Sequence, residues 1–421
     1  MTPRSRVALQ LGAAAIAAFV VAEGAVWLLR PRGEALEPLA VAVGEYFEPD
    51  QVERAEAFRD GQRALGLGGI ALSGAALLAL SLGRPRLAQR GLEALGRRPV
   101  LGGAAAGAAL TVAVAVIQLP LSLVAHERAV DYGLSTQDLA SWFADEGKGV
   151  AIAAVLTAAG AAILLALIRR LPRAWWAITA GGVVLYAVVS QALAPVLLAP
   201  LFNDFDRLPP GAERDAVVEL AQEADVEIGE IYEVDASRRS NSLNAYVTGL
   251  GPTKRVVVYD NLLAGVDREA LRSVLAHELA HAKNSDIWRG IAFVAIVAPL
   301  GMFLVRIGGS ALARRGGAEP GSPASLPAYG LAIGAVSLVI GVAGSQLSRD
   351  VEASADAFAL RLTDDPKALI ELQRNLAERN LSDPDPPAWS QFLFGTHPTT
   401  LERIGAAKAY ESESGRSGSR D

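Results

Sequence analysis

The chain has 421 residues, of which 51% are hydrophobic, 20% are charged and only 6% are aromatic. Ordinary soluble domains carry about 25% charged residues, and the apolar residues here stand in long uninterrupted runs, so the composition is that of a membrane protein. The formal net charge of -6 argues against a nucleic-acid partner. The absence of cysteine excludes disulfides, thiolate nucleophiles and sulfur-ligated metals.

Seven segments are apolar and long enough to cross a bilayer, for which a helix needs about 20 apolar residues. We expect these spans at 7–29, 65–83, 101–125, 149–168, 175–201, 287–309 and 327–347. For the first segment a signal peptide is the alternative, because Arg4 and Arg6 precede an apolar run, but the run continues past a normal signal core. The predicted fold is therefore an all-α multi-pass membrane protein with seven transmembrane helices.

The order of the spans places the long polar segments on one side of the membrane and three short loops on the other. The short loops, 84–100, 169–174 and 306–326, are rich in arginine. The positive-inside rule predicts that these loops and the N-terminus face the cytoplasm, and that the polar segments face outward. Loop 30–64, which lies on the side of the polar segments, weakens this difference in arginine content between the two sides, since it also carries five arginines.

The segment 202–286 is the only long polar stretch before the C-terminal tail. Residues 227–234 and 255–259 are rich in Val, Ile and Tyr and predict short strands, and the polar residues 237–251 between them predict turns. Asp267 is a plausible cap for a helix that follows. This segment is predicted to combine strands and helix in one small catalytic unit.

The tail from residue 348 predicts a helix through Leu362, a break at 365–366 and a second helix from Lys367. A proline-rich linker at 383–387 precedes a last short helix, and residues 411–421 are predicted to be disordered. The chain thus divides into a five-span membrane region, a first catalytic segment, a two-span hairpin, a second catalytic segment and a tail. Their bounds are 1–201, 202–286, 287–347, 348–410 and 411–421.

The strongest motif is His-Glu-Leu-Ala-His at residues 277–281, within the helix predicted from Asp267. Histidines four residues apart share one helix face, so His277 and His281 can both reach one tetrahedral zinc ion. Glu278 lies a fraction of a turn away, in position to take a proton from a water molecule at the metal. In a chain with four histidines, chance produces this pattern about once in several hundred sequences. We therefore predict a zinc site.

A catalytic zinc ion needs a third protein ligand and one open position. Without cysteine, this ligand must be a carboxylate or another histidine. Glu352 and Asp356 directly follow the last span, and a two-span hairpin returns them to the side of the histidine helix. One of them can bind the metal while the other hydrogen-bonds a ligand histidine. A solvated acidic face is the alternative interpretation.

Three further candidates rest on less specific patterns. His126 follows the third span in a predicted loop, where an interfacial histidine at a span end is the favoured interpretation. His397 can stabilise an oxyanion if it lies near the zinc ion, and the sequence alone leaves this open. Asn244 and Ala245 precede a strand and can hold a peptide by strand addition, with a simple turn as the alternative.

Together these motifs resemble the type I CAAX prenyl proteases, which are integral-membrane zinc metalloendopeptidases. The resemblance covers nearly the whole chain. It rests on the spans, the His-Glu-x-x-His motif, the pattern Ser-Arg-x-x-Glu-x-x-Ala-Asp at 348–356, and the segments 126–135, 199–203, 240–249 and 396–398.

The resemblance implies a helical barrel around a large chamber, with a zincin-like α+β catalytic unit and one zinc ion per chain. The implied metal ligands are His277, His281 and Glu352. The implied catalytic residues are Glu278 as base, Asp356 as a supporting or proton-donating acid, and His397 as oxyanion stabiliser. The implied holders of the substrate backbone are Asn244 and Ala245.

The substrates of that family are C-terminal CAAX peptides, which are cut after a prenylated cysteine. This chain departs from the family at Ala280, Ala282 and Ser242, where Gly, Trp and His are common, but keeps every ligand. We expect a multi-pass zinc metalloendopeptidase of the cell membrane that acts on a peptide or lipidated peptide. The alternatives are a quality-control metalloprotease without prenyl specificity, and a transporter or scaffold with a vestigial metal site.

Overall fold

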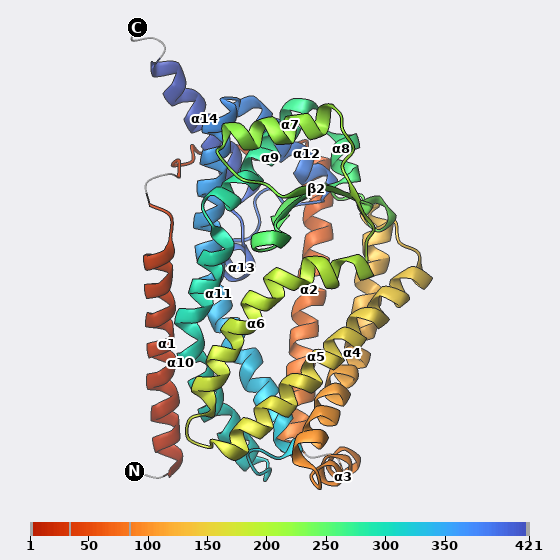
Figure 1. Cartoon of the computed structure of the whole chain (residues 1–421), viewed down its shortest axis with the longest axis vertical. Helices are drawn as coiled ribbons and strands as arrows, with labels where there is room; N and C mark the ends of the chain where they lie inside the picture. The colour runs from red at the N-terminus through yellow and green to blue at the C-terminus, as the bar shows by residue number, and fades with distance from the viewer. Residues whose placement is uncertain (1–2, 33–34, 84–85, 418–421) are drawn as a thin grey trace.

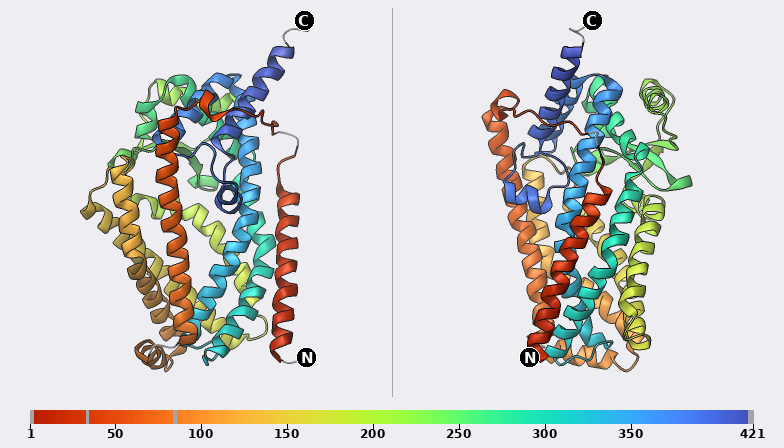
Figure 2. Two further views of the ribbon diagram at one scale, coloured as in Figure 1. Left: turned by 180° about the vertical axis from the view of Figure 1, so that it is seen from behind. Right: turned by 90° about the vertical axis from the view of Figure 1, so that its left-hand side faces the viewer.

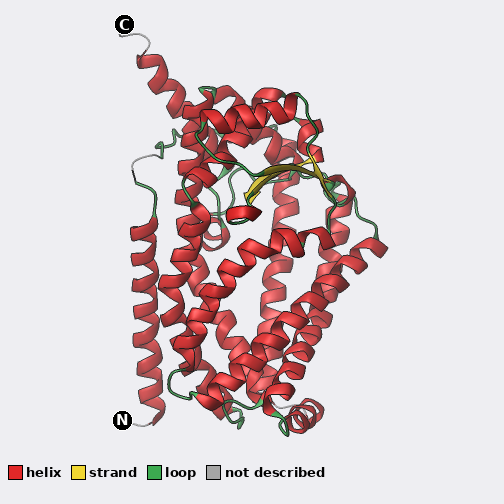
Figure 3. Cartoon of the chain, in the orientation of Figure 1, coloured by secondary structure: helices red, strands yellow, loops and turns green. Residues whose placement is uncertain are grey.

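The computed structural model describes residues 3–32, 35–83 and 86–417. Long helices run side by side along the molecule, and a smaller unit of helices and strands caps one end (Figure 1). The N-terminus lies at the end opposite this cap, and the C-terminus lies beyond it. Figure 3 shows that strands occur in the cap and that helices joined by loops form the rest.

Six helical segments of the described chain are long and apolar enough to cross a membrane. They are Pro49–Gly83, Pro99–Asp131, Leu139–Arg170, Trp175–Leu201, Asp286–Arg315 and Pro323–Thr363. Their main helices are α2 (Pro49–Leu78), α4 (Pro99–Asp131), α5 (Leu139–Arg170), α6 (Trp175–Leu197), α10 (Asp286–Arg315) and α11 (Leu326–Thr363). The first predicted span corresponds to α1 (Pro3–Leu29), whose part Ala15–Leu29 is an apolar helix. The predicted multi-pass helical fold is confirmed.

The membrane helices form a closed ring. In order, α2 contacts α4, α4 contacts α5, and the sequence of neighbours continues through α6, α10 and α11 back to α2. Helix α1 lies outside the ring against α10 and α11 (Figure 2), where Ala22 and Val26 pack with Phe293 and Leu347. A cavity of about 620 Å³, lined largely by glycines and apolar side chains, lies between α2 and α11. The ring with its cavity agrees with the expected helical barrel.

The loops group at the two ends of the molecule as the order of spans predicts. The N-terminus, α3 (Arg86–Leu95) and the connection between α10 and α11 lie at one end, and the strands lie at the other (Figure 1). The arginine-rich loops therefore face away from the cap. The side of the cell on which the cap lies stays a prediction.

The cap contains a four-stranded sheet in the order β1-β2-β4-β3. Its strands are β1 (Phe205–Arg207), β2 (Glu230–Val234), β3 (Ala245–Thr248) and β4 (Arg255–Tyr259). Strands β2 and β4 run parallel, and β1 and β3 pair antiparallel at the two edges. The two predicted strands are confirmed, but β3 replaces a predicted turn. The reason is its alternating burial, with Ala245 packed in the helical core and Tyr246 on the opposite face.

One face of the sheet is covered by helices from both polar segments. These helices are α7 (Ala212–Glu223), α8 (Asp260–Gly265), α9 (Arg268–Lys283), α12 (Pro366–Arg379) and α14 (Thr400–Ser417). Leu220, Val258, Leu275, Leu360 and Leu372 join them with the end of α11 in one buried cluster. The two catalytic segments, far apart in the chain, therefore share a single core.

Several helices extend past the bounds that hydropathy predicts. Helix α2 begins at Pro49 rather than near residue 65, because Glu48 and Gln51 form a capping box. Helix α4 continues to Asp131, so His126 lies on a helix and not in a loop. The imidazole ring of His126 is buried and stacks on Trp142 of α5, with the two ring centres 5.1 Å apart. This contact holds the helical turn against α5.

The end of the chain also contains more helix than predicted. Helix α13 (Ala388–Phe394) follows the proline-rich linker. Helix α14 continues through Ser417, into the segment that the composition predicted to be disordered. Thr399 and Glu402 hydrogen-bond each other's backbone amides and so cap the start of α14. Residues 418–421 lie outside the described part of the chain.

Candidate active site

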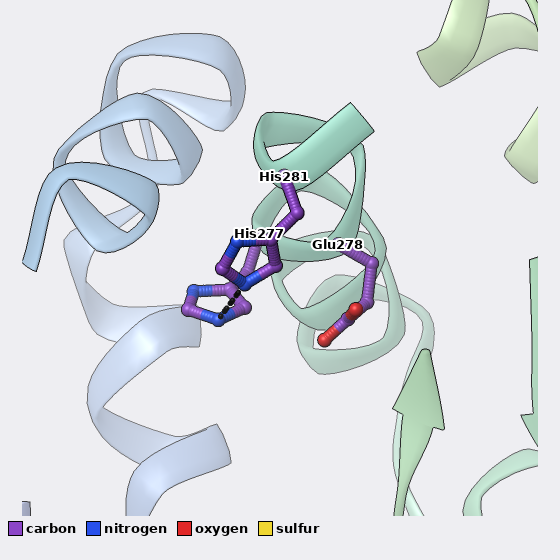
Figure 4. A group of neighbouring side chains, drawn as sticks. All are labelled: His277, Glu278 and His281. Atoms are coloured by element: carbon purple, nitrogen blue, oxygen red, sulfur yellow. Dashed lines mark hydrogen bonds between the residues drawn. The ribbon is translucent and has the colours of Figure 1, made fainter. Parts of the chain in front are cut away.

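Helix α9 presents the His-Glu-x-x-His motif at the inner face of the cap. The carboxylate of Asp267 accepts a hydrogen bond from the Ala270 amide at 2.7 Å and so caps the helix as predicted. Leu275 and Leu279 bury the opposite side of α9 in the core. Figure 4 shows the imidazoles of His277 and His281 side by side, with Glu278 projecting next to them. The ligand-capable atoms of these three residues lie within 4.8 Å of one another.

Four side-chain groups converge on one point beside α9. The Nε2 atoms of His277 and His281 are 3.3 Å apart. Glu352, on α11, places Oε2 3.1 Å from Nε2 of His277 and Oε1 3.7 Å from Nε2 of His281. His397 lies at the edge of this group, with Nε2 3.4 Å from Oε2 of Glu352.

These donors fit a tetrahedral metal ion. Zinc binds imidazole nitrogen and carboxylate oxygen at about 2.0–2.2 Å, which in a tetrahedron places ligand atoms about 3.3–3.6 Å apart. The separations between the two imidazoles and the carboxylate, 3.3, 3.1 and 3.7 Å, are close to that range. Two neutral imidazoles and one carboxylate are also a donor set that zinc accepts in catalytic sites.

The second nitrogen of His277 is held by a buried ion pair. Its Nδ1 is 2.9 Å from Oδ1 of Asp356. Arg403, on α14, donates to both oxygens of that carboxylate, from Nε at 2.7 Å and from Nη2 at 2.5 Å. We call His277, Asp356 and Arg403 the buried triad. It fixes the orientation of the imidazole and keeps its Nε2 directed at the point where the candidate ligand atoms of His277, His281 and Glu352 converge, which we call the metal point.

The second nitrogen of His281 is held in the same way but nearer the surface. Its Nδ1 is 3.0 Å from Oδ2 of Asp286, and Nε of Arg289 donates to Oδ1 of Asp286 at 2.9 Å. We call His281, Asp286 and Arg289 the outer triad. Both candidate ligand histidines therefore have a carboxylate partner that is itself paired with an arginine.

Glu278 lies between the metal point and the edge of the sheet. Its Oε2 accepts a hydrogen bond from the Val247 amide of β3 at 3.3 Å. Burial raises the pKa of this carboxyl above its usual value. A carboxylate with a raised pKa can hold a proton more readily at neutral pH, which suits a general base.

Strand β3 forms one edge of the sheet beside Glu278 and, among the described residues, pairs with no strand except β4. Asn244 is exposed at its start and Ala245 is its first residue. The preceding Leu243 is clamped by Asn380, whose side chain accepts from the Leu243 amide at 2.8 Å and donates to its carbonyl at 3.1 Å. The open edge of β3 is thus held in position next to the metal point.

His397 is positioned by the segment that contains α13. Arg349 donates to the carbonyls of Gln391 and Gly395, and Gln391 donates to the carbonyl of His397 at 2.7 Å. The side chain of His397 is 56% exposed, and partial desolvation of its inward-facing part lowers its pKa below the usual histidine value. Its Nδ1 lies 3.0 Å from the hydroxyl of Thr396, which leaves Nε2 on the side of Glu352.

The structure places the eight predicted site residues in the cap around α9 and β3, whereas His126, a weaker candidate outside that set, lies apart on α4. Sequence reasoning missed four residues that hold the others in place: Asp286, Arg289, Asn380 and Arg403. Asp286 could have been proposed from the sequence, because it is an acidic residue only five positions after His281. The other three offer no motif of their own.

A ring of membrane helices capped by a helix with two histidines and a glutamate defines an integral-membrane metalloprotease. Residues 212–411 match the profile of peptidase family M48. Residues 65–204 match the profile described as CAAX prenyl protease N-terminal, five membrane helices. The chain belongs to the CAAX protease family of M48 metallopeptidases, as the resemblance predicted.

Known relatives agree with this assignment. An uncharacterized metalloprotease of Bacillus subtilis, YhfN, is 28% identical over 311 residues, which are 72% of each chain. CAAX prenyl protease 1 of Saccharomyces cerevisiae is 26% identical over 71% of this chain and 70% of its own. A CAAX prenyl protease 1 homolog of Oryza sativa is 34% identical over 51% of this chain, and the alignment spans about half (52%) of the rice protein.

The fold is also shared with a solved structure. The crystal structure of S. mikatae Ste24p superposes with a TM-score of 0.73 and covers 97% of this chain and 99% of its own. The sequence identity is 19%, so this likeness concerns the fold alone. It supports the arrangement of the membrane ring and the cap.

Proposed function

We propose that this protein is a zinc-dependent endopeptidase that hydrolyses a peptide bond near the C-terminus of a lipidated or otherwise membrane-associated protein. The observation that carries the proposal is the convergence of His277, His281 and Glu352 beside the open edge of β3. The metal point and the place for an extended peptide thus adjoin each other. Glu278 lies between them.

In this proposal His277, His281 and Glu352 hold the zinc ion. Bound there, zinc would act as a Lewis acid on the peptide carbonyl and would lower the pKa of a water molecule. Glu278 takes the proton of the attacking water and passes it to the departing amine. Its pKa, which burial raises, suits both transfers.

The peptide is proposed to lie along β3 as an added strand. Asn244 and the backbone of Ala245 would hold the substrate main chain next to Glu278. The ring of His397, with Nε2 facing the ligand carboxylate, would donate a hydrogen bond to the developing oxyanion. Asp356 orients His277 through its Nδ1 and is proposed to act by that contact.

Two adjoining cavities support a substrate with an apolar chain. The cavity of about 620 Å³ between α2 and α11 extends up to Leu393 and Phe394 of α13. A polar cavity of about 450 Å³ is also lined by Phe394, together with His397 and Arg403. A lipid chain in the first cavity and a peptide in the second would meet at α13. The relatives named CAAX prenyl protease 1 point to the same substrate class.

The test is mass spectrometry of a farnesylated CAAX peptide and its unprenylated twin after incubation with the purified protein in detergent. We expect cleavage of the prenylated peptide after its cysteine. The Glu278→Gln variant is the matched control and should retain zinc but lose cleavage, because only the base is removed. Cleavage by this variant at the wild-type rate would contradict the role of Glu278.

A membrane quality-control protease without prenyl specificity is the second candidate. It is favoured by a 35% identity over 41% of the chain with a Protease HtpX homolog of Desulfatibacillum aliphaticivorans. Cleavage of both peptides, or of a generic membrane-protein substrate alone, would support it. A vestigial metal site would give zinc-free protein and no cleavage of any substrate.

A further inference from the structure

A third cavity, of about 340 Å³, lies under the sheet, on the face opposite the catalytic core. One wall is the end of the membrane segment Trp175–Leu201, with Gln191 and Ala194 of α6, Leu198 directly after α6, and Phe202 beyond the segment. The other wall is the sheet, with Tyr246 and Thr248 of β3 and Arg255 of β4. Figure 1 shows that the sheet lies directly beyond this end of α6. The cavity is thus at the level where the span leaves the membrane.

Arg255 is a buried cation without an anionic partner. It is only 9% exposed, and its Nη2 has no hydrogen-bond partner. The neighbouring carboxylate of Glu230, paired with it in strand register, is directed to Arg207 at 3.6 Å. Among the described residues no carboxylate forms an ion pair with Arg255, and none of those that line the cavity is acidic. A buried charge normally requires a partner, because its desolvation is costly.

Two aromatic rings hold the guanidinium in a fixed position. Its carbon lies 5.6 Å from the ring centre of Phe205 and 5.3 Å from that of Tyr232. The guanidinium carries its N–H donors in one plane, and Nη2 among them has no partner. The planar edge matches the oxygens of a phosphate, which it can bind with two hydrogen bonds. The hydroxyls of Tyr246 and Thr248 add two further donors on the same wall.

We propose that this cavity binds the phosphate of an anionic phospholipid, with Arg255 as its principal contact. The apolar wall of α6 accommodates the glycerol and the start of an acyl chain, and the sheet supplies the donors. A volume of about 340 Å³ is at the lower end of ligand pockets, of about 300–1,000 Å³, and suits a headgroup rather than a whole lipid. The site adjoins β3 from the face opposite Glu278 and does not depend on the proposed peptidase function.

Native mass spectrometry of the full chain in detergent tests this site. The protein is titrated with phosphatidylglycerol and with phosphatidylcholine of the same acyl chains, and inorganic phosphate is added as a competitor. We expect the first phosphatidylglycerol to bind about tenfold more tightly than phosphatidylcholine, because the choline cation of phosphatidylcholine would lie close to the buried positive charge of Arg255. Arg255→Gln should abolish this preference. Lys254→Gln, which removes an adjacent positive charge outside the cavity, should keep it.

Three results would overturn the proposal. The first is an unchanged preference in a folded Arg255→Gln variant, and the second is an equal loss in Lys254→Gln. The third is competition by inorganic phosphate without any preference for phosphatidylglycerol, which would assign the site to a free anion. If Arg255→Gln does not fold, the same lipid titration of Arg255→Lys tests the role of Arg255. It should keep part of the preference, because it retains the charge without the two-pronged edge, and a full wild-type preference would contradict the role of Arg255.

Discussion

The buried triad and the outer triad hold the two candidate ligand histidines by the same contact in two different settings. In the buried triad the side chains are 7%, 2% and 12% exposed, in the order histidine, aspartate, arginine. In the outer triad they are 20%, 11% and 22% exposed. The chemical groups are identical, but the buried triad is less exposed, and its arginine contacts both carboxylate oxygens where Arg289 contacts one.

The contribution of such a contact to stability grows as water is excluded from it. In the outer triad, water can replace a lost partner, and a partly exposed ion pair contributes little to stability. In the buried triad, a lost partner leaves a charge that water cannot reach. The buried triad also joins α9, α11 and α14, whereas the outer triad is local in the sequence. We therefore expect mutations to act more strongly on the buried side.

The largest effect is expected for Arg403→Met. Removal of this guanidinium leaves the buried carboxylate of Asp356 with the His277 imidazole but without its arginine partner, and losing one member of a buried ion-pair network costs up to about 3–5 kcal/mol of stability. Denaturant unfolding of the metal-free protein in detergent measures this change. A stability equal to that of the wild type would show that water reaches Asp356, and the two triads would then not differ.

The next effect concerns zinc affinity. Loss of a carboxylate that orients a ligand histidine typically weakens metal binding by about 10–100-fold. We expect Asp356→Asn to lie at the upper end of this range and Asp286→Asn at the lower end, because only the second site admits water. Competition with a chelator of known affinity measures both dissociation constants. A weaker zinc affinity in Asp286→Asn than in Asp356→Asn would reverse the comparison.

The pH dependence of zinc binding should also come from the buried side. Burial alone would lower the pKa of His277, but its hydrogen bonds to Asp356 and then to Glu352 raise it to about 10 in the metal-free protein. Zinc requires the neutral ring, so binding at pH 7 releases a proton, and affinity falls by about tenfold for each pH unit below 10. Calorimetry in buffers of different ionisation enthalpy measures this proton. A release that Asp356→Asn leaves unchanged would contradict the assignment.

The same shift predicts the stability of the metal-free protein. The pKa of His277 in the folded protein, about 10, lies above the value of about 6.5 for an unfolded histidine. The contact of protonated His277 with Asp356 therefore stabilises the fold fully below about pH 6.5. This contribution is lost as the pH rises through about 10. Unfolding of the metal-free protein across this range measures the loss. In Asp356→Asn the slope should be smaller.

The smallest effect is expected for Arg289→Met in the outer triad. Its guanidinium is 22% exposed, so water can solvate Asp286 after the substitution. The change in unfolding free energy should stay below about 1 kcal/mol. The same unfolding assay as for Arg403→Met measures it. A loss as large as that in the buried triad would show that exposure does not govern the two contacts.

Local periodicity and the order of spans allowed much of the site to be predicted. The four-residue spacing of His277 and His281 requires only a regular helix, and Asp267 marks where that helix begins. Glu352 could be expected near them because a two-span hairpin returns it to the same side. The helix ends were predicted less well, since hydropathy marks the hydrocarbon region but not the polar turns by which α2, α4 and α5 continue beyond it.

The remaining site residues depend on tertiary packing. Arg403 meets Asp356 only because α14 packs against α11, and nothing in its neighbourhood marks that contact. Asp286 faces back toward His281 because Ser285 takes a left-handed conformation with φ of 57° between α9 and α10. The sequence predicts a turn where strand β3 forms, because its four residues acquire their alternation only by pairing with β4.

The most direct test of the account is zinc K-edge X-ray absorption of the purified protein, combined with a measured zinc content. We expect one zinc ion per chain, bound by two imidazole nitrogens and by oxygen, with the oxygen shell altered in Glu352→Gln and preserved in Glu278→Gln. Zinc-free protein, or a coordination shell that Glu352→Gln leaves unchanged, would contradict the proposed metal centre.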